Sequence, residues 1–572
     1  MKTQLPLDWS DGANKEQRAE VLSWDGRLDN RSDLLPLLAD SLRGETDNAA
    51  LARAVYERWG TAGFVRLIGD WSVVIRDHAN RVVVLASDFA GVRPLYYHSN
   101  SGHVFWSTRL QSVVDATGIS ELDEDFLRGF LLFGGCPNRT PYKAIYSVPP
   151  GHAVCVSKSG TKIQRFWALP TSDEIRYRTE RQYEEQLRVL FREAVTVRLQ
   201  TESPVLAELS GGLDSSSVVS MANQLTRSGG VKASRLTGLS YVWKNSLDEP
   251  FIREVESFCG IDGFHISTHD VPVISETEVG NSSPEVFHPL RLSAAAAAQR
   301  IGAKVILTGQ MGDLTMGNWF DDSLQVAESL RRLHIGSACH EALAWSKILR
   351  LPVYAILWKA LCAALPGSLA ANGIFAAPDG SYMPKSAETS LRVTNANSNP
   401  EGFCSNEWKQ APPERRKHFR NLSTILELRT LQTPECLQHL DYTHPFAHRP
   451  LVEFLMAVPS NILCRPGEPR KLMRSALPHL WPLRLQKRRS KALFDSAWQE
   501  ALQPLARILL REKSLHLVER GFLNRRSVVS RLQRLSAGLD CNEGQLQHII
   551  LLEFWLRRRA NGELSEQMLK AA

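Results

Sequence analysis

Cysteines are few in this sequence and form no recognisable pattern. Nine are scattered over 572 residues, with no C-x-x-C pair and no spacing typical of a zinc site. The sequence therefore indicates neither a disulfide framework nor a structural zinc centre. An odd, dispersed set of thiols is typical of a reduced, cytoplasmic protein.

Long hydrophobic runs are also missing. The chain starts MKTQLPLDWSDG, without the apolar segment that a signal peptide needs. The most apolar stretch, residues 351–365, is interrupted by Lys359 and is too short to cross a bilayer. The sequence therefore predicts no membrane span.

Neither sign of charge is in large excess. The net charge is +7, from 68 Lys and Arg against 61 Asp and Glu. Such a balance permits an anionic ligand without requiring nucleic acid, so we expect no nucleic-acid partner. The composition, 43% hydrophobic and 23% charged, is that of a globular protein, and the length indicates more than one domain.

Residues 1–170 are predicted to form a β-rich domain. Short apolar runs are separated by Gly, Asn and Pro, which is typical of antiparallel hairpins. These runs cover residues 63–75, 81–86, 94–98, 103–107, 152–157 and 163–167.

Residues 180–572 are predicted to form a second domain, which begins with alternating strands and helices. We expect helices near 181–200, 215–227, 249–259 and 292–301, and strands just before 210 and over 235–242, 264–267 and 304–308. Such alternation predicts a parallel, doubly wound sheet, so the fold class is α/β with a β-rich N-terminal domain. Beyond Asp321 we expect mostly helices, with long loops over 366–385 and 394–413.

The stretch LAELSGGLDSSSVVS, residues 206–220, lies where a predicted strand ends and a helix begins. Gly211 and Gly212 allow close backbone approach. The helix that follows offers free N–H groups and the positive end of its dipole. Ser210, Ser215 and Ser216 add hydroxyl donors. A tight turn with a serine cap would explain two glycines alone, but the whole stretch favours a phosphate-binding nest.

Asp214 indicates that a cation accompanies the phosphate, because a carboxylate beside phosphates needs positive charge between them. Mg²⁺ is commonly held by one or two carboxylates plus phosphate oxygens. A second stretch, VILTGQMGDLTMGNW, is another apolar strand that ends in glycines and Asp313. Asp214 and Asp313 are therefore the predicted metal ligands.

The motifs resemble those of the asparagine synthetase family, a group of N-type ATP pyrophosphatases. The turn is similar to the S-G-G-x-D-S pyrophosphate loop, and the second stretch to S-G-x-G-x-D-E-x-x-x-G, with Gln310 and Leu314 where acidic residues are common. Further similar segments are HPFAHRPLVEFLMAVP (444–459), PRKLMRSALPHLWP (469–482) and RSKALF (489–494). His448 stands where an Asp is common in the family.

The resemblance implies an AMP-forming carbon–nitrogen ligase that uses ATP and Mg²⁺. The residues implied around the nucleotide are Leu209, Ser210, Gly211, Gly212, Leu213, Asp214, Ser215, Ser216, Ser240, Thr308 and Gly309. Lys491 matches the family's Lys beside the acyl-adenylate, where it can neutralise the charge that grows as the amine attacks. The catalytic residues are therefore expected to be Lys491, Asp214 and Asp313.

The N-terminal domain resembles a degenerate class II glutamine amidotransferase of the Ntn type. Similar segments are WDGRLDN (24–30), SDFAGVRPLYY (87–97) and VPPGH (148–152). Glutamine-dependent members use an N-terminal cysteine as nucleophile. Here the chain begins Met-Lys-Thr and the first cysteine is Cys136, so we expect no glutaminase activity.

Without that ammonia source, we expect the amine to arrive with the substrate. The segments look most like those of lasso peptide macrolactam synthetases, which implies a precursor peptide as substrate, with a leader-recognition protein and a leader peptidase as partners. An ammonia-using asparagine synthetase and a β-lactam synthetase are alternatives. Gln310 weakens the second, because it stands where β-lactam synthetases have a Tyr and cannot take a proton. A non-catalytic scaffold and a metal hydrolase using His265 and His269 are more distant alternatives.

Overall fold

A computed structural model describes ten stretches of the chain. They are residues 4–6, 19–42, 44–100, 102–171, 174–317, 323–364, 407–412, 415–488, 495–539 and 543–571. Lys491 and almost all of the two expected long loops lie outside the described residues. Among the helices that are described, none is long and apolar enough to cross a membrane.

The N-terminal part is a sandwich of two antiparallel sheets, of order β2-β3-β4-β8-β9 and β1-β6-β5-β7. The strands are β1 (Gln4–Pro6), β2 (Ala19–Gly26), β3 (Trp71–Asp77), β4 (Val82–Ser87), β5 (Tyr96–Ser99), β6 (His103–Ser107), β7 (Tyr146–Ser147), β8 (His152–Ser157) and β9 (Gly160–Arg165). The prediction of an antiparallel, β-rich domain is therefore confirmed.

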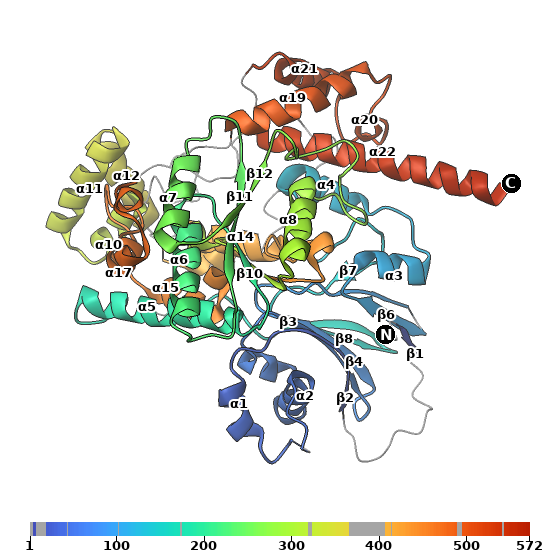
Figure 1. The fold of residues 1–572 in the computed structure, drawn as a ribbon, viewed down its shortest axis with the longest axis horizontal. Helices are drawn as coiled ribbons and strands as arrows, with labels where there is room; N and C mark the ends of the chain where they lie inside the picture. The colour runs from blue at the N-terminus through green and yellow to red at the C-terminus, as the bar shows by residue number, and fades with distance from the viewer. Residues whose placement is uncertain are drawn as a thin grey trace.

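Strand β3 is buried on both faces, which explains its continuous apolar run. Val74 points into the layer between the two sheets, whereas Val73 and Ile75 face the opposite way. That outer face is covered by α1 (Arg31–Leu38) and α2 (Asn48–Trp59), two helices that we did not predict (Figure 1).

The expected strand over residues 63–75 is wrong in its first half. Gly60–Arg66 forms a 3-10 helix, η1, and the strand begins only at Trp71. The apolar residues of this segment serve tertiary packing, because the Phe64 ring lies 5.9 Å from that of Trp71 in the core beneath α2.

The second part is built on a five-stranded sheet of order β12-β11-β10-β13-β14, with every pair parallel. Its strands are β10 (Val205–Glu208), β11 (Leu236–Val242), β12 (Gly263–Ser267), β13 (Val305–Leu307) and β14 (Asp441–Thr443). Four of them were predicted. The fifth, β14, was missed because it has three residues and enters an edge position from a distant, largely helical segment.

Helices cover both faces of this sheet, as a doubly wound topology requires (Figure 1). Val205 and Ala207 face α5 (Glu180–Thr196) and α6 (Leu213–Arg227). Leu206 and Ile306 face α8 (His288–Ile301). The alternation along β10 therefore places successive side chains in two different cores. Helix α7 (Glu249–Cys259) lies beside α6 and contacts β11.

The rest of the described chain is mostly helical, as expected. One group contains α9 (Gly312–Thr315), α10 (Val326–Arg331), α11 (Ile335–Leu349), α12 (Val353–Ala364), α14 (Arg416–Glu427), α15 (Arg449–Ala457), α16 (Ser460–Leu463), α17 (Lys471–Ala476) and α18 (Leu483–Lys487). The C-terminal group contains α19 (Asp495–Arg511), α20 (His516–Glu519), α21 (Arg525–Ser536) and α22 (Glu543–Ala571).

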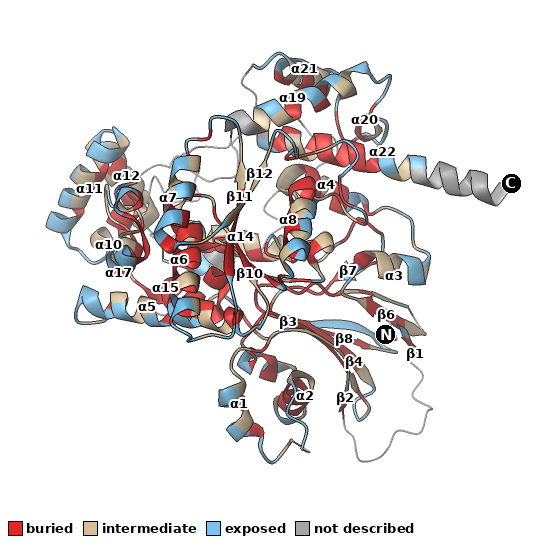
Figure 2. Cartoon of the chain, in the orientation of Figure 1, coloured by how far each residue is buried: buried red, intermediate tan, exposed pale blue. Residues whose placement is uncertain are grey.

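The C-terminal helices share a core with the N-terminal domain. Helix α4 (Glu124–Phe133) packs against α22, and Phe126, Leu127 and Phe130 join the buried residues of α19, α21 and α22 (Figure 2). A short helix, α3 (Leu110–Thr117), precedes α4. The two parts of the chain are thus joined by apolar packing at one place.

A buried ion cluster joins them at another. Asp70, next to β3, pairs with Arg27 at 2.9 Å and with Arg198 at 3.3 Å, and accepts a hydrogen bond from Thr443 in β14. Arg27 also reaches Asp441 in β14 at 3.0 Å. Asp70 and Arg198 are each about 1% exposed. Despite desolvation, the two guanidinium groups hold the pKa of Asp70 well below its usual range.

Replacing Asp70 should therefore destabilise the protein strongly. Asp70→Asn leaves the buried Arg198 guanidinium without its carboxylate and takes one of three carboxylate partners from Arg27, which costs on the order of 3 kcal/mol. Thermal and urea unfolding would measure the loss. The matched control is Glu185→Gln, which removes an exposed pair with Arg181 and should leave the unfolding midpoint unchanged.

The pH dependence has a definite sign. The folded pKa of Asp70 is depressed, so its contribution is fully present above the unfolded value of about 3.9 and is lost as pH falls toward the folded value. Wild type and Asp70→Asn should therefore converge in stability at strongly acidic pH. A gap that stays constant down to the acid transition would contradict this assignment.

Candidate active site

Two glycine-containing loops meet at the carboxyl edge of the parallel sheet. One follows β10 and leads into α6, and the other follows the neighbouring strand β13 and leads into α9. A Cβ added at Gly309 would lie 2.6 Å from the backbone nitrogen of Ser215, and one at Gly312 would lie 2.5 Å from Cγ of Asp214. Only residues without a side chain allow the loops to pack this closely. The two stretches that we singled out in the sequence are thus brought together.

The first loop has the geometry of a tight strand-to-helix turn. Gly211 has φ +69°, in the left-handed region, and a Cβ there would lie 2.9 Å from the carbonyl oxygen of Asp248. Gly212 caps α6 with an extended backbone, and Leu213 begins the helix with its side chain in the core. The free N–H groups of the first turn of α6 face this loop.

Hydroxyl groups gather around the same turn. Ser215 Oγ accepts a hydrogen bond from the Ser210 N–H at 3.1 Å and lies 3.1 Å from Ser210 Oγ. Leu209 holds the loop to the neighbouring strand by donating its N–H to Leu239. Among the described residues, Ser216 Oγ and Ser240 Oγ are buried without a hydrogen-bond partner. Such orphaned hydroxyls are expected beside a polar ligand.

Asp214 is paired with Arg470, a residue that we did not predict. Arg470 precedes α17, has a left-handed backbone and donates its N–H to Gly317 at the end of the second loop. Its guanidinium and backbone therefore hold the two loops from one side. The sequence signal was available, since Arg470 lies in the PRKLMR segment that resembles the family motif.

Arg488 holds the first loop from the other side. It donates to the carbonyl oxygen of Gly211 at 2.9 Å, pairs with Asp248, and lies 4.0 Å from the ring centre of Phe251. Two arginines thus flank the predicted phosphate-binding turn, which suits an anionic ligand. Sequence reasoning did not single out Arg488, although it lies three residues before Lys491.

The second loop presents Asp313 to solvent. It lies in the first turn of α9 with an exposed side chain, one residue from the Gly312 that touches Asp214. Two carboxylates on adjoining loops beside a helix N-terminus fit the oxygen donors that Mg²⁺ prefers. The oxygen donors therefore suit the predicted ion, which would have to share Asp214 with the Arg470 guanidinium.

Thr308 is held within the protein. Its hydroxyl donates to Nδ1 of His444 at 2.7 Å and accepts the N–H of Gln310 at 3.2 Å. Burial lowers the pKa of His444 to about 4, so this imidazole is neutral. Thr308 and His444 thereby fix the start of the second loop.

Glu208, the last residue of β10, forms a polar chain at the same edge. It accepts a hydrogen bond from the Tyr442 hydroxyl at 3.3 Å, and Tyr442 in turn accepts one from the Gln310 side-chain amide at 3.0 Å. Sequence reasoning missed this group, because Tyr442 lies in the unpredicted strand β14. The one available signal was a Glu where an apolar strand residue is expected.

A separate cluster has the donor types of a metal site. Ligand atoms of Glu285, His288 and Cys436 lie within 4.8 Å of one another. Arg291 already pairs with Glu285 at 2.6 Å, and burial raises the pKa of the Cys436 thiol to about 12. A protonated thiol and a carboxylate bound to arginine favour a structural cluster here. His265 and His269, the pair of the metal-hydrolase alternative, form no such cluster with other described residues; His265 bonds Glu256 at 2.6 Å, and His269 lies 3.4 Å from Asp270.

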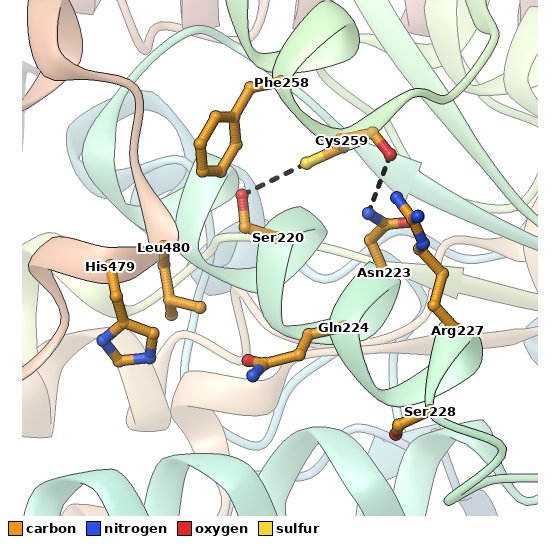
Figure 3. A pocket seen from close by; sticks show the side chains of 9 residues that line it. All are labelled: Ser220, Asn223, Gln224, Arg227, Ser228, Phe258, Cys259, His479 and Leu480. Atoms are coloured by element: carbon orange, nitrogen blue, oxygen red, sulfur yellow. Dashed lines mark hydrogen bonds between the residues drawn. The ribbon is translucent and has the colours of Figure 1, made fainter.

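A pocket of about 400 Å³ lies on the outer side of α6, away from the loops. It is lined by Ser220, Asn223, Gln224, Arg227, Ser228, Phe258, Cys259, His479 and Leu480 (Figure 3). Ser220 and Asn223 bond to Cys259 of α7. None of the predicted site residues lines this pocket, which separates it from the glycine loops.

Two family models match the chain. One, described as asparagine synthase, matches residues 186–557, and one described as glutamine amidotransferase domain matches residues 13–167.

Curated relatives are similar over part of the chain. The identity is 26% over 317 residues with amidase chry2 of Gibberella zeae, covering 49% of this chain and 45% of that protein. It is 26% over 302 residues with amidase chyE of Penicillium rubens, covering 47% and 42%. It is 28% over 218 residues with asparagine synthetase [glutamine-hydrolyzing] 3 of Bacillus subtilis, covering 35% and 33%. The chain spans less than half the length of each of these relatives.

The contact between the loops gives a test of the site. Gly309→Ala should push the second loop away from Ser215 and reduce ATP binding at least about tenfold, a change of about 1.4 kcal/mol. Titration with a fluorescent ATP analogue would measure it. Gly336→Ala is the matched control, since a Cβ there meets nothing within 4 Å. Equal affinity of the two variants for the ATP analogue would show that nucleotide binding does not depend on the contact between the loops.

Proposed function

The chain belongs to the asparagine synthase family, and we propose that it is an ATP-dependent amide-forming ligase that closes a macrolactam ring in a peptide. The observation that carries the ligase proposal is the packing of two glycine loops around Asp214 and the N-terminus of α6, flanked by Arg470 and Arg488. The predicted phosphate-binding turn, the carboxylates and the arginines all lie at the carboxyl edge of the parallel sheet, which is where doubly wound sheets bind ligands.

The first half-reaction is adenylation of a carboxylate. The turn from Leu209 to Ser216 binds the phosphates of ATP through backbone N–H groups and hydroxyls. Asp214 and Asp313 would hold Mg²⁺, which shields the phosphate charge. A substrate Asp or Glu side chain attacks the α-phosphate, giving an acyl-adenylate and pyrophosphate.

The second half-reaction joins the peptide N-terminal amine to the activated acyl group and releases AMP. Lys491 would stabilise the charge on the oxyanion that forms as the amine attacks. The site must also exclude water from the labile adenylate and hold the peptide so that its two reacting groups meet. A leader-recognition protein and a leader peptidase would deliver the processed peptide.

The thiols of the N-terminal domain support an amine that comes with the substrate. Burial raises the pKa of Cys136 to about 11 and also raises that of Cys155. Both are therefore protonated at neutral pH and lack the thiolate character of a nucleophile that could release ammonia from glutamine. Asparagine formation from aspartate and free ammonia remains the second candidate, favoured by the similarity to asparagine synthetases.

Mass spectrometry separates the two candidates. Protein, ATP and Mg²⁺ are mixed with a candidate leaderless precursor peptide in one tube, and with aspartate and ammonia in another. Loss of one water from the peptide, together with AMP, supports the macrolactam ligase. Asparagine with an unchanged peptide supports the second candidate, and AMP in neither tube contradicts both.

Substitutions at the site should act on different half-reactions. Asp214→Ala and Asp313→Ala should lower AMP formation about 100-fold or more, because the phosphates lose their metal. Lys491→Ala should mainly slow amide formation. Its matched control is Lys487→Ala, which changes an exposed lysine four residues earlier in the chain. Wild-type turnover in all three site variants would show that the site is wrong.

A further inference from the structure

Glu208 is a half-buried carboxylate at the end of β10, and few groups compensate its charge. Within the described part of the chain, its one hydrogen bond, from the Tyr442 hydroxyl, is long at 3.3 Å. No ion pair joins it to another of the described residues; the nearest cationic influence is Arg291 on α8, whose guanidinium pairs with Glu285. Buried carboxylates normally gain several hydrogen bonds or a charged partner. Glu208 has neither in full.

Asp70 shows what a structural buried carboxylate looks like in the same protein. It has two arginines and a threonine hydroxyl as partners, and its pKa lies well below its usual range. Burial instead raises the pKa of Glu208 to about 7, because Arg291 and the Tyr442 hydroxyl offset desolvation only in part. A carboxylate in this condition can gain and lose a proton near neutral pH.

Two phenols and one guanidinium group lie around Glu208. Burial raises the pKa of Tyr442 on β14 and of Tyr241 on β11 well above 10, so both phenols are neutral. Arg291 on α8 is the cation that acts on this carboxyl. The polar chain thus holds one group that changes protonation in the physiological range, and that group is Glu208.

The hydrogen-bonded chain from Gln310 through Tyr442 to Glu208 lies next to both glycine loops. Glu208 lies two residues before Ser210 in the first loop, and Gln310 lies in the second, between the glycines that touch Ser215 and Asp214. The Gln310 amide donates to Tyr442, which donates to Glu208. The side chain of Glu208 is not fully enclosed, since its residue is half-buried at the strand end.

We propose that Glu208 is the general base that removes a proton from the attacking amine, with Tyr442 and Gln310 as the residues that position it. The inference rests on the proposed function. Glu208 would supply the proton acceptor that the protein lacks at residue 310, because the Gln310 side chain cannot accept a proton.

The amine lone pair forms a C–N bond to the acyl carbon of the adenylate, and one amine proton passes to the Glu208 carboxylate. The bond between the acyl carbon and the phosphate oxygen breaks, and AMP leaves with the electron pair. Glu208 then returns the proton to solvent. No oxidant or reductant is needed.

The central experiment compares wild type with Glu208→Gln in both half-reactions. Ring closure should fall about 100-fold or more, which is typical of losing a general base. Hydroxylamine, which is largely neutral at neutral pH and needs no base, should still trap the acyl-adenylate as hydroxamate at close to the wild-type rate. Ring closure by wild type should rise with pH through the range near 7, and this limb should disappear in Glu208→Gln.

Folding of the variant can be checked independently. A carboxyl whose folded pKa is raised loses stability as pH rises through that value. The neutral amide of Glu208→Gln removes this penalty, so its melting temperature above neutral pH should be no lower than that of wild type. Glu208→Asp, which keeps a carboxylate, should restore part of the ring closure.

Tyr442→Phe tests the positioning role. It should slow ring closure and shift the pH limb while hydroxamate formation continues. Tyr241→Phe is the matched control, because it removes a buried phenol from the neighbouring strand β11, and it should keep the wild-type pH profile.

The outcomes separate this proposal from the ligase itself. If wild type forms neither hydroxamate nor amide, the proposed function fails. If wild type closes the ring and Glu208→Gln does so at the same rate and with the same pH profile, the base assignment is overturned while the ligase stands. If Glu208→Gln loses hydroxamate and amide together, Glu208 serves adenylation or folding, which also overturns the base assignment.

Discussion

Backbone contact between two strand-end loops is the constraint on which the site depends. A Cβ at Gly309 would lie 2.6 Å from the backbone nitrogen of Ser215, and backbone cannot move aside as a flexible side chain can. This contact sets the distance between the loop after β10 and the loop after β13. It therefore fixes where Asp214 and Asp313 can lie, which hydroxyls surround the N-terminus of α6, and how the polar chain through Gln310 reaches Glu208.

Charge is handled in opposite ways at two places in the protein. Between the domains, Asp70 is enclosed by Arg27 and Arg198 and stays ionised. A carboxylate with two arginine partners suits a permanent contact between the domains, because breaking the ion pairs leaves uncompensated charge in the interior. At the carboxyl edge, the residues that the structure describes give Glu208 one long hydrogen bond, and burial raises its pKa. Incomplete compensation is costly for stability but useful for proton transfer, which is why we assign these two carboxylates different roles.

The N-terminal domain contributes to the architecture of the second part. Arg27 and Arg93 both bind Asp441, the first residue of β14, and Thr443 at the other end of that strand bonds Asp70. Strand β14 carries Tyr442, so the ion cluster that holds β14 against the sheet also holds one member of the polar chain. The short strand would have few contacts of its own, with three residues paired to β13. The N-terminal domain thereby helps to position Tyr442, a residue of the polar chain at the carboxyl edge of the sheet.

The sequence by itself determined the local features of this protein. Apolar periodicity fixed β10, β11, β12 and β13 and the helices between them, and the glycines and serines around Asp214 fixed the turn before α6. These features depend on residues close together in the chain, where spacing alone carries the physical information. Tertiary structure decided the rest. It placed Arg470 on Asp214 across 256 residues and Tyr442 on Glu208 across 234. Tertiary packing also adds the short strand β14 to the sheet. The first half of the 63–75 run forms part of a 3-10 helix that contains Phe64, instead of a strand. Those choices follow from burial and charge pairing between distant segments, because a three-residue strand or a single arginine has no periodicity to reveal its partner.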